Sequence, residues 1–252
     1  GFPAILWAFL WWRLVVDRPG DAKWLTNNEK HDLQAQLDIE QQSIKPVKNY
    51  AVAFRSRIVI LLCLQYALWC IGVYGFVMWL PSIINAAPDS DIVKTGWLAS
   101  VPYLLAIIGM LTASYFSDKT LKRKSFIWPF LLIGSLAFYG SYLIGTSNFW
   151  LSYILLVIAG GTMYAPYGPF FAVITEVLPR NVSAGAIALI NSLGALGSFV
   201  GAYIVGYLNG TTGGFGASYI FMAGSLFVSA ILTIIALKKN ISVNPSPIHH
   251  LS

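Results

Sequence analysis

Six long stretches without a charged side chain divide this sequence. They run over residues 58–80, 95–117, 125–146, 149–175, 182–209 and 215–237. Each is long enough for the roughly 20 residues that a helix needs to cross the hydrocarbon core of a bilayer. A mean hydropathy of +0.67 and a charged fraction of 10% also lie outside the usual range of a soluble domain. The sequence therefore predicts an all-α membrane protein with a six-helix domain over residues 58–237.

A shorter apolar segment precedes these stretches. Residues 1–16 are apolar apart from Arg13, but they are too few to cross a bilayer on their own. They also lack the starting Met, the charged n-region and the small-residue cleavage site of a signal peptide. We interpret residues 1–16 as the end of a further, truncated spanning helix.

Lys and Arg residues fall almost entirely on one side of the expected spans. Fifteen of the 16 lie before the first span, in the 118–124 loop, in the 178–181 turn or in the 238–252 tail, and only Lys94 lies on the other side. The positive-inside rule places the side with the fifteen in the cytoplasm. Topology therefore explains the net charge of +6, and we expect a lipid bilayer, and no nucleic acid, among the partners.

Residues 17–57 form the predicted central cytoplasmic loop, and residues 238–252 form a cytoplasmic tail. Thr26 with Glu29 matches a capping box, and Leu33 and Leu37 follow with polar residues between them. This pattern predicts a short helix on the membrane surface. Basic and acidic residues are nearly balanced in the loop, which favours a solvated linker over a binding domain.

The sequence offers little for catalysis. Its three histidines lie in the loop and the tail, and it contains no HExxH motif and no paired Asp within a span. Cys63 and Cys70 are seven residues apart on one expected helix, which is too far for a disulfide and is not a zinc spacing. We interpret both as packing residues, and we expect no enzyme activity, no metal and no cofactor.

Uncharged polar side chains occur within the spans instead. Gln65 shares a helix face with Trp69, and Asn191 is a lone carboxamide in the fifth span. Neutral groups can bind a polyhydroxylated solute at a lower insertion cost than charged ones, which favours a solute pathway. Asn191 could equally bond a neighbouring helix. Gly197 and Gly201 form a small-xxx-small pair that lets another helix approach closely.

The fourth span combines aromatic residues with prolines. Tyr164, Tyr167 and Phe171 recur at helical spacing, and Pro166 and Pro169 remove backbone donors between them. A bend with exposed carbonyl groups is therefore expected, which a membrane protein tolerates beside a cavity. The aromatic stripe is suited to lining a pathway, although packing and an interface belt are alternatives.

Short motifs spread across the chain carry a resemblance to a known family. They are the loop opening at residues 17–29, Trp-Leu-Pro at 79–81, Gly-Pro-Phe-Phe at 168–171, Thr-Glu at 175–176 and Ala-Leu-Ile-Asn-Ser-Leu-Gly at 188–194. Together they resemble the C-terminal half of a major facilitator superfamily transporter of the anion:cation symporter group. The resemblance implies one half of a 12-helix fold, with a missing N-terminal six-helix half as its partner.

The resemblance also implies a function. It implies secondary active transport of a small organic anion such as a sugar acid (a hexuronate, galactonate or a related compound), coupled to H+ and working by alternating access. The implied substrate contacts in this half are Gln65, Phe171 and Asn191, with Tyr164 and Tyr167 on the same aromatic stripe. The location implied is a bacterial inner membrane. The alternative is a membrane-embedded binding or assembly subunit without transport of its own.

The 118–124 loop resembles the superfamily's cytoplasmic loop motif, whose charged residues hold the cytoplasmic side closed. The resemblance therefore implies a gate role, beside the topology signal, for Asp118, Lys119, Lys122 and Arg123. Ser114 and Leu121 stand at the two positions where the motif has glycine, for a close helix contact and for a tight turn.

Overall fold

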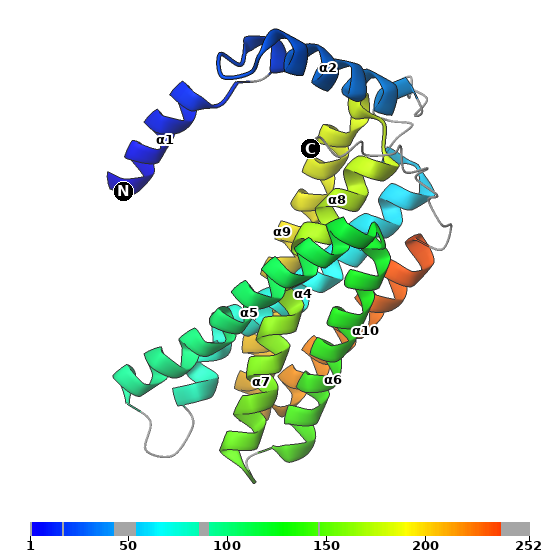
Figure 1. The fold of residues 1–252 in the computed structure, drawn as a ribbon. Coiled ribbons are helices and arrows are strands. Elements are labelled where there is room, and N and C mark those ends of the chain that lie inside the picture. The colour runs from blue at the N-terminus through cyan, green and yellow to red at the C-terminus, as the bar shows by residue number, and fades with distance from the viewer. Residues whose placement is uncertain (1, 17, 43–53, 86–90, 146, 238–252) are drawn as a thin grey trace. The chain divides into compact units, whose positions relative to one another are not determined.

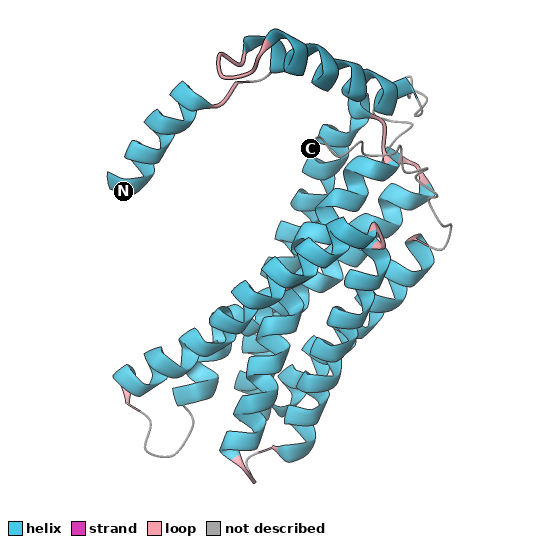
Figure 2. Ribbon diagram, viewed as in Figure 1, coloured by secondary structure: helices cyan, strands magenta, loops and turns pink. Residues whose placement is uncertain are grey.

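A computed structural model describes residues 2–16, 18–42, 54–85, 91–145 and 147–237 (Figures 1 and 2). Every regular element in these residues is helical. The chain divides into two compact units, Gly1–Pro46 and Val47–Ser252. The expected tail at 238–252 and the loop residues 43–53 lie outside the described residues.

The first unit contains α1 (Phe2–Leu14), the 3-10 turn η1 (Pro19–Asp21) and α2 (Asn27–Gln42). The capping box is confirmed, because Glu29 Oε2 accepts from the Thr26 backbone N–H and from its hydroxyl, both at 2.8 Å. The Glu29 N–H in turn donates to Thr26 Oγ1 at 3.4 Å. This reciprocal cap satisfies donors that a helix start leaves open and sets where α2 begins.

The second unit carries six segments long and apolar enough to cross a membrane, as expected. Its helices are α4 (Arg57–Asn85), α5 (Ile92–Thr120), the 3-10 turn η2 (Arg123–Phe126), α6 (Trp128–Ile144), α7 (Phe149–Tyr164), α8 (Tyr167–Val177), α9 (Arg180–Thr212) and α10 (Gly216–Ala236). Helix α4 lies at the centre and packs against α9, α10, α5 and α7 (Figure 1). Helix α6 packs against both α7 and α10. The all-α, six-span class is confirmed.

Helices α4 and α9 approach each other very closely. A Cβ atom placed on Gly197 would lie 2.2 Å from the Ala67 carbonyl oxygen, and one on Gly201 would lie 2.3 Å from that of Ile71. No side chain fits at such distances, so only glycine permits this approach. The small-xxx-small prediction is confirmed, and the partner helix is α4.

The fourth span is interrupted where its prolines predicted a bend. Helix α7 ends at Tyr164 and α8 begins at Tyr167, with two turn residues between them. The Trp69 indole Nε1 donates to the Met163 carbonyl oxygen at 2.8 Å, just before this interruption. A buried tryptophan of α4 therefore binds one of the carbonyl groups near the break.

The turn after α5 forms without the glycines of the loop motif. Leu121 adopts a left-handed conformation (φ 55°, ψ 14°), and it is the only non-glycine residue with positive φ among those described. A Cβ on Gly168 of α8 would lie 2.2 Å from Ser114 Oγ. The close contact at Ser114 thus depends on a glycine of the facing helix, and the tight turn is made by a strained leucine.

Candidate functional site

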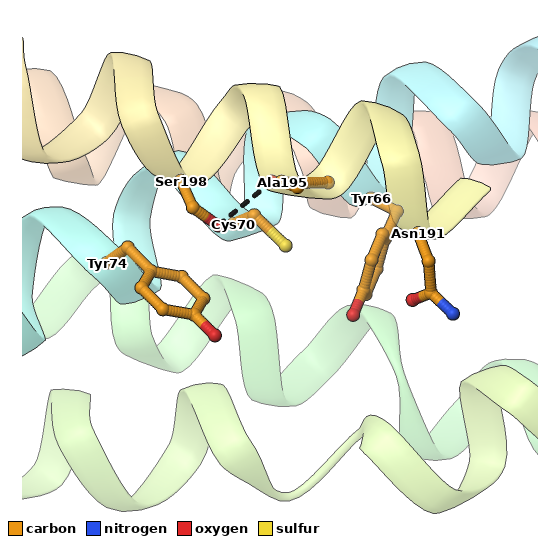
Figure 3. Close-up of a pocket in the computed structure, with 7 residues that line it drawn as sticks. Tyr66, Cys70, Tyr74, Asn191, Ala195 and Ser198 are labelled. Carbon is orange, nitrogen blue, oxygen red and sulfur yellow. Dashed lines mark hydrogen bonds between the residues drawn. The ribbon is translucent and has the colours of Figure 1, made fainter. Parts of the chain in front are cut away.

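A pocket of about 330 Å³ opens between α4 and α9 (Figure 3). Its lining residues are Tyr66, Cys70, Tyr74, Asn191, Gly194, Ala195 and Ser198. None of them carries a formal charge. Within the described part of the chain, no group of three His, Cys, Asp or Glu side chains could hold a metal. The pocket therefore offers neutral hydrogen-bonding groups.

Helical spacing places the lining residues on two facing stripes. Tyr66, Cys70 and Tyr74 are four residues apart on α4, so they share one face of that helix. Asn191, Ala195 and Ser198 form the matching stripe on α9. The Ser198 hydroxyl donates to the Gly194 carbonyl oxygen at 2.9 Å, so its remaining capacity toward the pocket is as an acceptor.

Asn191 lies in the pocket wall with its carboxamide exposed. In Figure 3 the carboxamide projects beside the Tyr66 ring, and the Tyr66 hydroxyl points the same way. The Asn191 side chain forms no hydrogen bond with any other residue that the structure describes. Its carboxamide therefore stays available to a solute, and the two alternatives for Asn191, a pathway-lining role and a bond to a neighbouring helix, stay predictions.

The expected aromatic residues of the fourth span gather behind this wall. The Tyr66 ring stacks on Phe170 at 5.1 Å and meets Phe171 edge-on at 5.6 Å. Tyr167 packs against Trp69 at 4.5 Å and stacks on Tyr164 at 5.7 Å. The structure thus brings Phe171, Tyr164 and Tyr167 into one aromatic cluster that ends on Tyr66, although none of these three lines the pocket itself.

Gln65 is placed differently from the other expected contacts. Its side chain is fully buried, and neither Oε1 nor Nε2 has a hydrogen-bond partner in the described structure. It lies about 100° around α4 from Tyr66, away from the pocket face. Its backbone oxygen accepts from Ser229 Oγ of α10 at 2.9 Å. A solute contact at Gln65 stays a prediction, and the pocket does not include this residue.

Of the seven lining residues, only Asn191 was expected from the sequence. The unexpected residues with a hydroxyl or thiol group are Tyr66, Cys70, Tyr74 and Ser198. The signal for three of them was available, because Tyr66, Cys70 and Tyr74 repeat at a spacing of four in an otherwise apolar helix. Cys70 is nearly buried, as a packing residue would be, yet its thiol borders the pocket. Cys63 lies in the apolar core.

A cluster of charged and polar side chains lies at the predicted cytoplasmic end of the bundle. Arg123 pairs with Asp118 at the end of α5, donates from Nε to Glu176 Oε1 at 2.9 Å and donates from Nη1 to Ser117 Oγ at 3.2 Å. Lys124 Nζ donates to the Ile234 carbonyl oxygen at 3.1 Å, near the end of α10. Asp118 and Arg123 are thus brought together with Glu176.

Lys119 and Lys122, the other two expected gate residues, take no part in this group. Both are exposed, and neither forms an ion pair with any residue that the structure describes. Their position suits the topology signal, and a gate role for them stays a prediction.

The six membrane-length helices, the neutral pocket and the charged loop define a multi-pass membrane protein of the all-α class. The chain belongs to the Major Facilitator Superfamily, whose sequence profile matches residues 1–202 and 89–250. The expected fold, the six-helix C-terminal half of a protein of this superfamily, agrees with these matches and with the relatives.

Three relatives show how far the similarity extends. A protein of Agrobacterium vitis named "Putative tartrate transporter" is 30% identical over 239 residues, which cover 94% of this chain and 53% of the relative. The "Quinolone resistance transporter" of Acinetobacter baumannii is 29% identical over 244 residues, 95% of this chain and 55% of the relative.

The third relative, the "Probable galactarate/D-glucarate transporter GudP" of Escherichia coli K12, is 23% identical over 263 residues, 96% of this chain and 57% of the relative. The chain therefore spans about half the length of the curated relatives that it matches.

Proposed function

We propose that this chain forms the C-terminal half of a secondary active transporter for a small organic anion, such as a sugar acid. Uptake is coupled to H+, occurs across a bacterial inner membrane and works by alternating access between two six-helix halves. The observation that carries the proposal is the neutral pocket between α4 and α9, in which Asn191 lies beside Tyr66. The names of relatives, which include tartrate and galactarate/D-glucarate transporters, support the solute class.

The chemistry of the pocket supports different roles for the two halves, in which this half binds the hydroxyl groups of the solute. Carboxamide, phenol and hydroxyl groups both donate and accept hydrogen bonds, as the hydroxyl groups of a sugar acid do. A carboxylate needs a cationic partner when it leaves water, and the seven lining residues include none. In this proposal the N-terminal half supplies the cation for the carboxylate and the groups that carry the coupling proton.

The charged group at Arg123 supports a role in closing the predicted cytoplasmic side. One guanidinium links the end of α5, through Asp118, to the end of α8, through Glu176. Helix α8 begins next to the aromatic cluster behind the pocket. In the transport cycle, this link holds the ends of the two helices together while the pocket faces the other side.

Uptake measurements test the proposal. The open reading frame that encodes these residues is expressed in full, and membrane vesicles are given labelled tartrate or galactarate with and without an inward proton gradient. We expect saturable uptake that the gradient accelerates, and an Asn191→Ala variant that reaches the membrane but needs more solute for half-maximal uptake. Binding of either acid without gradient-driven accumulation would instead indicate a binding subunit and would overturn the proposed transport.

A further inference from the structure

We infer that Tyr66 is the residue of α4 that contacts the transported solute, and that its phenolic group recognises a solute hydroxyl. The inference rests on the proposed function and deepens it, because it assigns hydroxylated organic acids, rather than organic acids in general, to this wall of the pocket.

The position of Tyr66 is the first step. It is the tenth of the 29 residues of α4, on the face that Cys70 and Tyr74 continue, and it lines the same pocket as Asn191. In Figure 3 the Tyr66 hydroxyl and the Asn191 carboxamide project side by side from the two helices. Two neutral hydrogen-bonding groups therefore reach the same part of the pocket from two neighbouring helices.

Burial restricts what Tyr66 can present to a solute. Only 7% of the residue is exposed, although it borders the pocket. Its ring face is covered by Phe170, at 5.1 Å and nearly parallel, and Phe171 and Trp69 pack against it edge-on at 5.6 Å each. The ring is thus used for packing. The hydroxyl at its free end lies within hydrogen-bonding reach of Cys70 and Tyr167, and it keeps the capacity for a further bond to the solute.

Gly194 of α9 packs against the Tyr66 ring from the side of α9. A Cβ atom on Gly194 would lie 2.4 Å from Cε1 of Tyr66 and 2.6 Å from Cδ1. The ring therefore occupies space that any other residue at position 194 would fill. With α8 on one side and α9 on the other, Tyr66 is held in a single orientation, and a group held in place before binding loses little freedom when the solute arrives.

The chemistry of a phenol selects the solute group. Its hydroxyl donates one hydrogen bond and accepts others, which matches a solute hydroxyl, and it carries no charge to balance a carboxylate. A pocket that hydrogen-bonds a hydroxyl discriminates against an analogue without it, because its polar groups are then left unpaired. Tartrate and succinate are four-carbon diacids that differ only in two hydroxyl groups, so they form a suitable probe pair.

The experiment measures the inhibition constants of tartrate and succinate against uptake of labelled galactarate by the full-length protein. We expect Tyr66→Phe, which keeps the ring and removes the hydroxyl, to weaken tartrate by about threefold to tenfold and leave succinate unchanged. Gly194→Ala should act in the same direction, because the added methyl group displaces the ring.

Tyr153→Phe is the matched control. The Tyr153 hydroxyl donates to the Leu98 carbonyl oxygen at 2.8 Å, outside the pocket, so this change also removes one phenolic group. It should leave the ratio of the two inhibition constants unchanged.

Three outcomes separate the inference from the proposed function. An unchanged ratio of tartrate to succinate inhibition in Tyr66→Phe, with galactarate uptake intact, overturns the role of Tyr66 alone. Equal weakening of both acids also overturns it, because the hydroxyl would then act on the shape of the pocket. Absence of organic-acid uptake by the wild type overturns the proposed function, and this inference with it.

Discussion

Arg123 and Glu176 are 53 positions apart in the sequence, yet Arg123 Nε donates to Glu176 Oε1 at 2.9 Å. The bond connects the turn after α5 to the last residues of α8. The same guanidinium pairs with Asp118, so one side chain serves two carboxylates from two helices. Of the two ion pairs, the one with the less exposed carboxylate, Glu176, should contribute more to the free energy of unfolding.

We therefore expect Glu176→Gln to destabilise the bundle more than Asp118→Asn. The Asp118 side chain is 68% exposed and that of Glu176 is 30% exposed, so solvent screens the Asp118 pair more strongly. The loss at Glu176 should be about 1 kcal/mol at most. Thermal unfolding of the purified protein in detergent measures both variants, and a larger loss for Asp118→Asn would contradict this reading.

Trp69→Phe should destabilise the protein by about 1–3 kcal/mol, since it leaves the buried Met163 carbonyl without the indole donor. Trp79→Phe is the control, because Trp79 Nε1 also donates to a backbone carbonyl, that of Ala202, at 2.9 Å. Ala202 lies within α9 and keeps its helical hydrogen bond, so the loss should be smaller. Amide exchange around residues 163–167 should rise in Trp69→Phe only.

Gly197→Ala and Gly201→Ala should each destabilise the contact between α4 and α9 by about 1–3 kcal/mol or more. The added methyl groups would meet backbone atoms of α4, which cannot move aside without separating the helices. Gly210→Ala provides a control on the same helix, where a Cβ atom meets nothing within 4 Å. There alanine should stabilise α9 by up to about 1 kcal/mol, and melting temperatures that rank the three variants differently would refute the argument.

Leu121→Gly should raise the melting temperature. A left-handed backbone costs a non-glycine residue about 1–2 kcal/mol, and glycine avoids this cost at the expense of a more flexible unfolded chain. The net gain should therefore be below about 1 kcal/mol. Lys122→Gly, at a residue with φ of −93°, should show no such gain.

The start of α2 should respond to acid. Hydrogen bonds from the Thr26 backbone and hydroxyl lower the pKa of Glu29 below its ordinary value. A carboxylate with a lowered folded pKa stabilises the helix above its unfolded pKa, about 4.3, and this contribution disappears as pH falls through the folded value. Amide exchange in α2 should thus increase below about pH 4, and Thr26→Ala should remove most of that dependence.

Features with a local cause could be predicted from the sequence. The six spans follow from charge-free length, the interruption of the fourth span from Pro166 and Pro169, and the start of α2 from Thr26 and Glu29. The close contact of α9 followed from Gly197 and Gly201, although its partner did not. Each of these depends on one continuous stretch of the sequence.

Features set by the rotation of one helix against another could not be predicted. Gln65 and Tyr66 are adjacent, and only the packing of α4 decides which faces the pocket and which the bundle interior. A carboxamide in an apolar helix suggests a pathway whichever way it points. The bond between Arg123 and Glu176 likewise depends on where α5 and α8 end in space.

The shortness of α8 has a mechanical consequence. Its 11 residues extend for about 16 Å, which is too short for appreciable bending, so a tilt of α8 would turn it as a rigid body, with the break before Tyr167 as the pivot. A tilt of about 10° at that pivot displaces the far end by roughly 3 Å, enough to part Glu176 from Arg123. A small rearrangement of the rings around Tyr167, at one end of α8, would therefore be enough to form or break the ion pair between Glu176 and Arg123 at its other end.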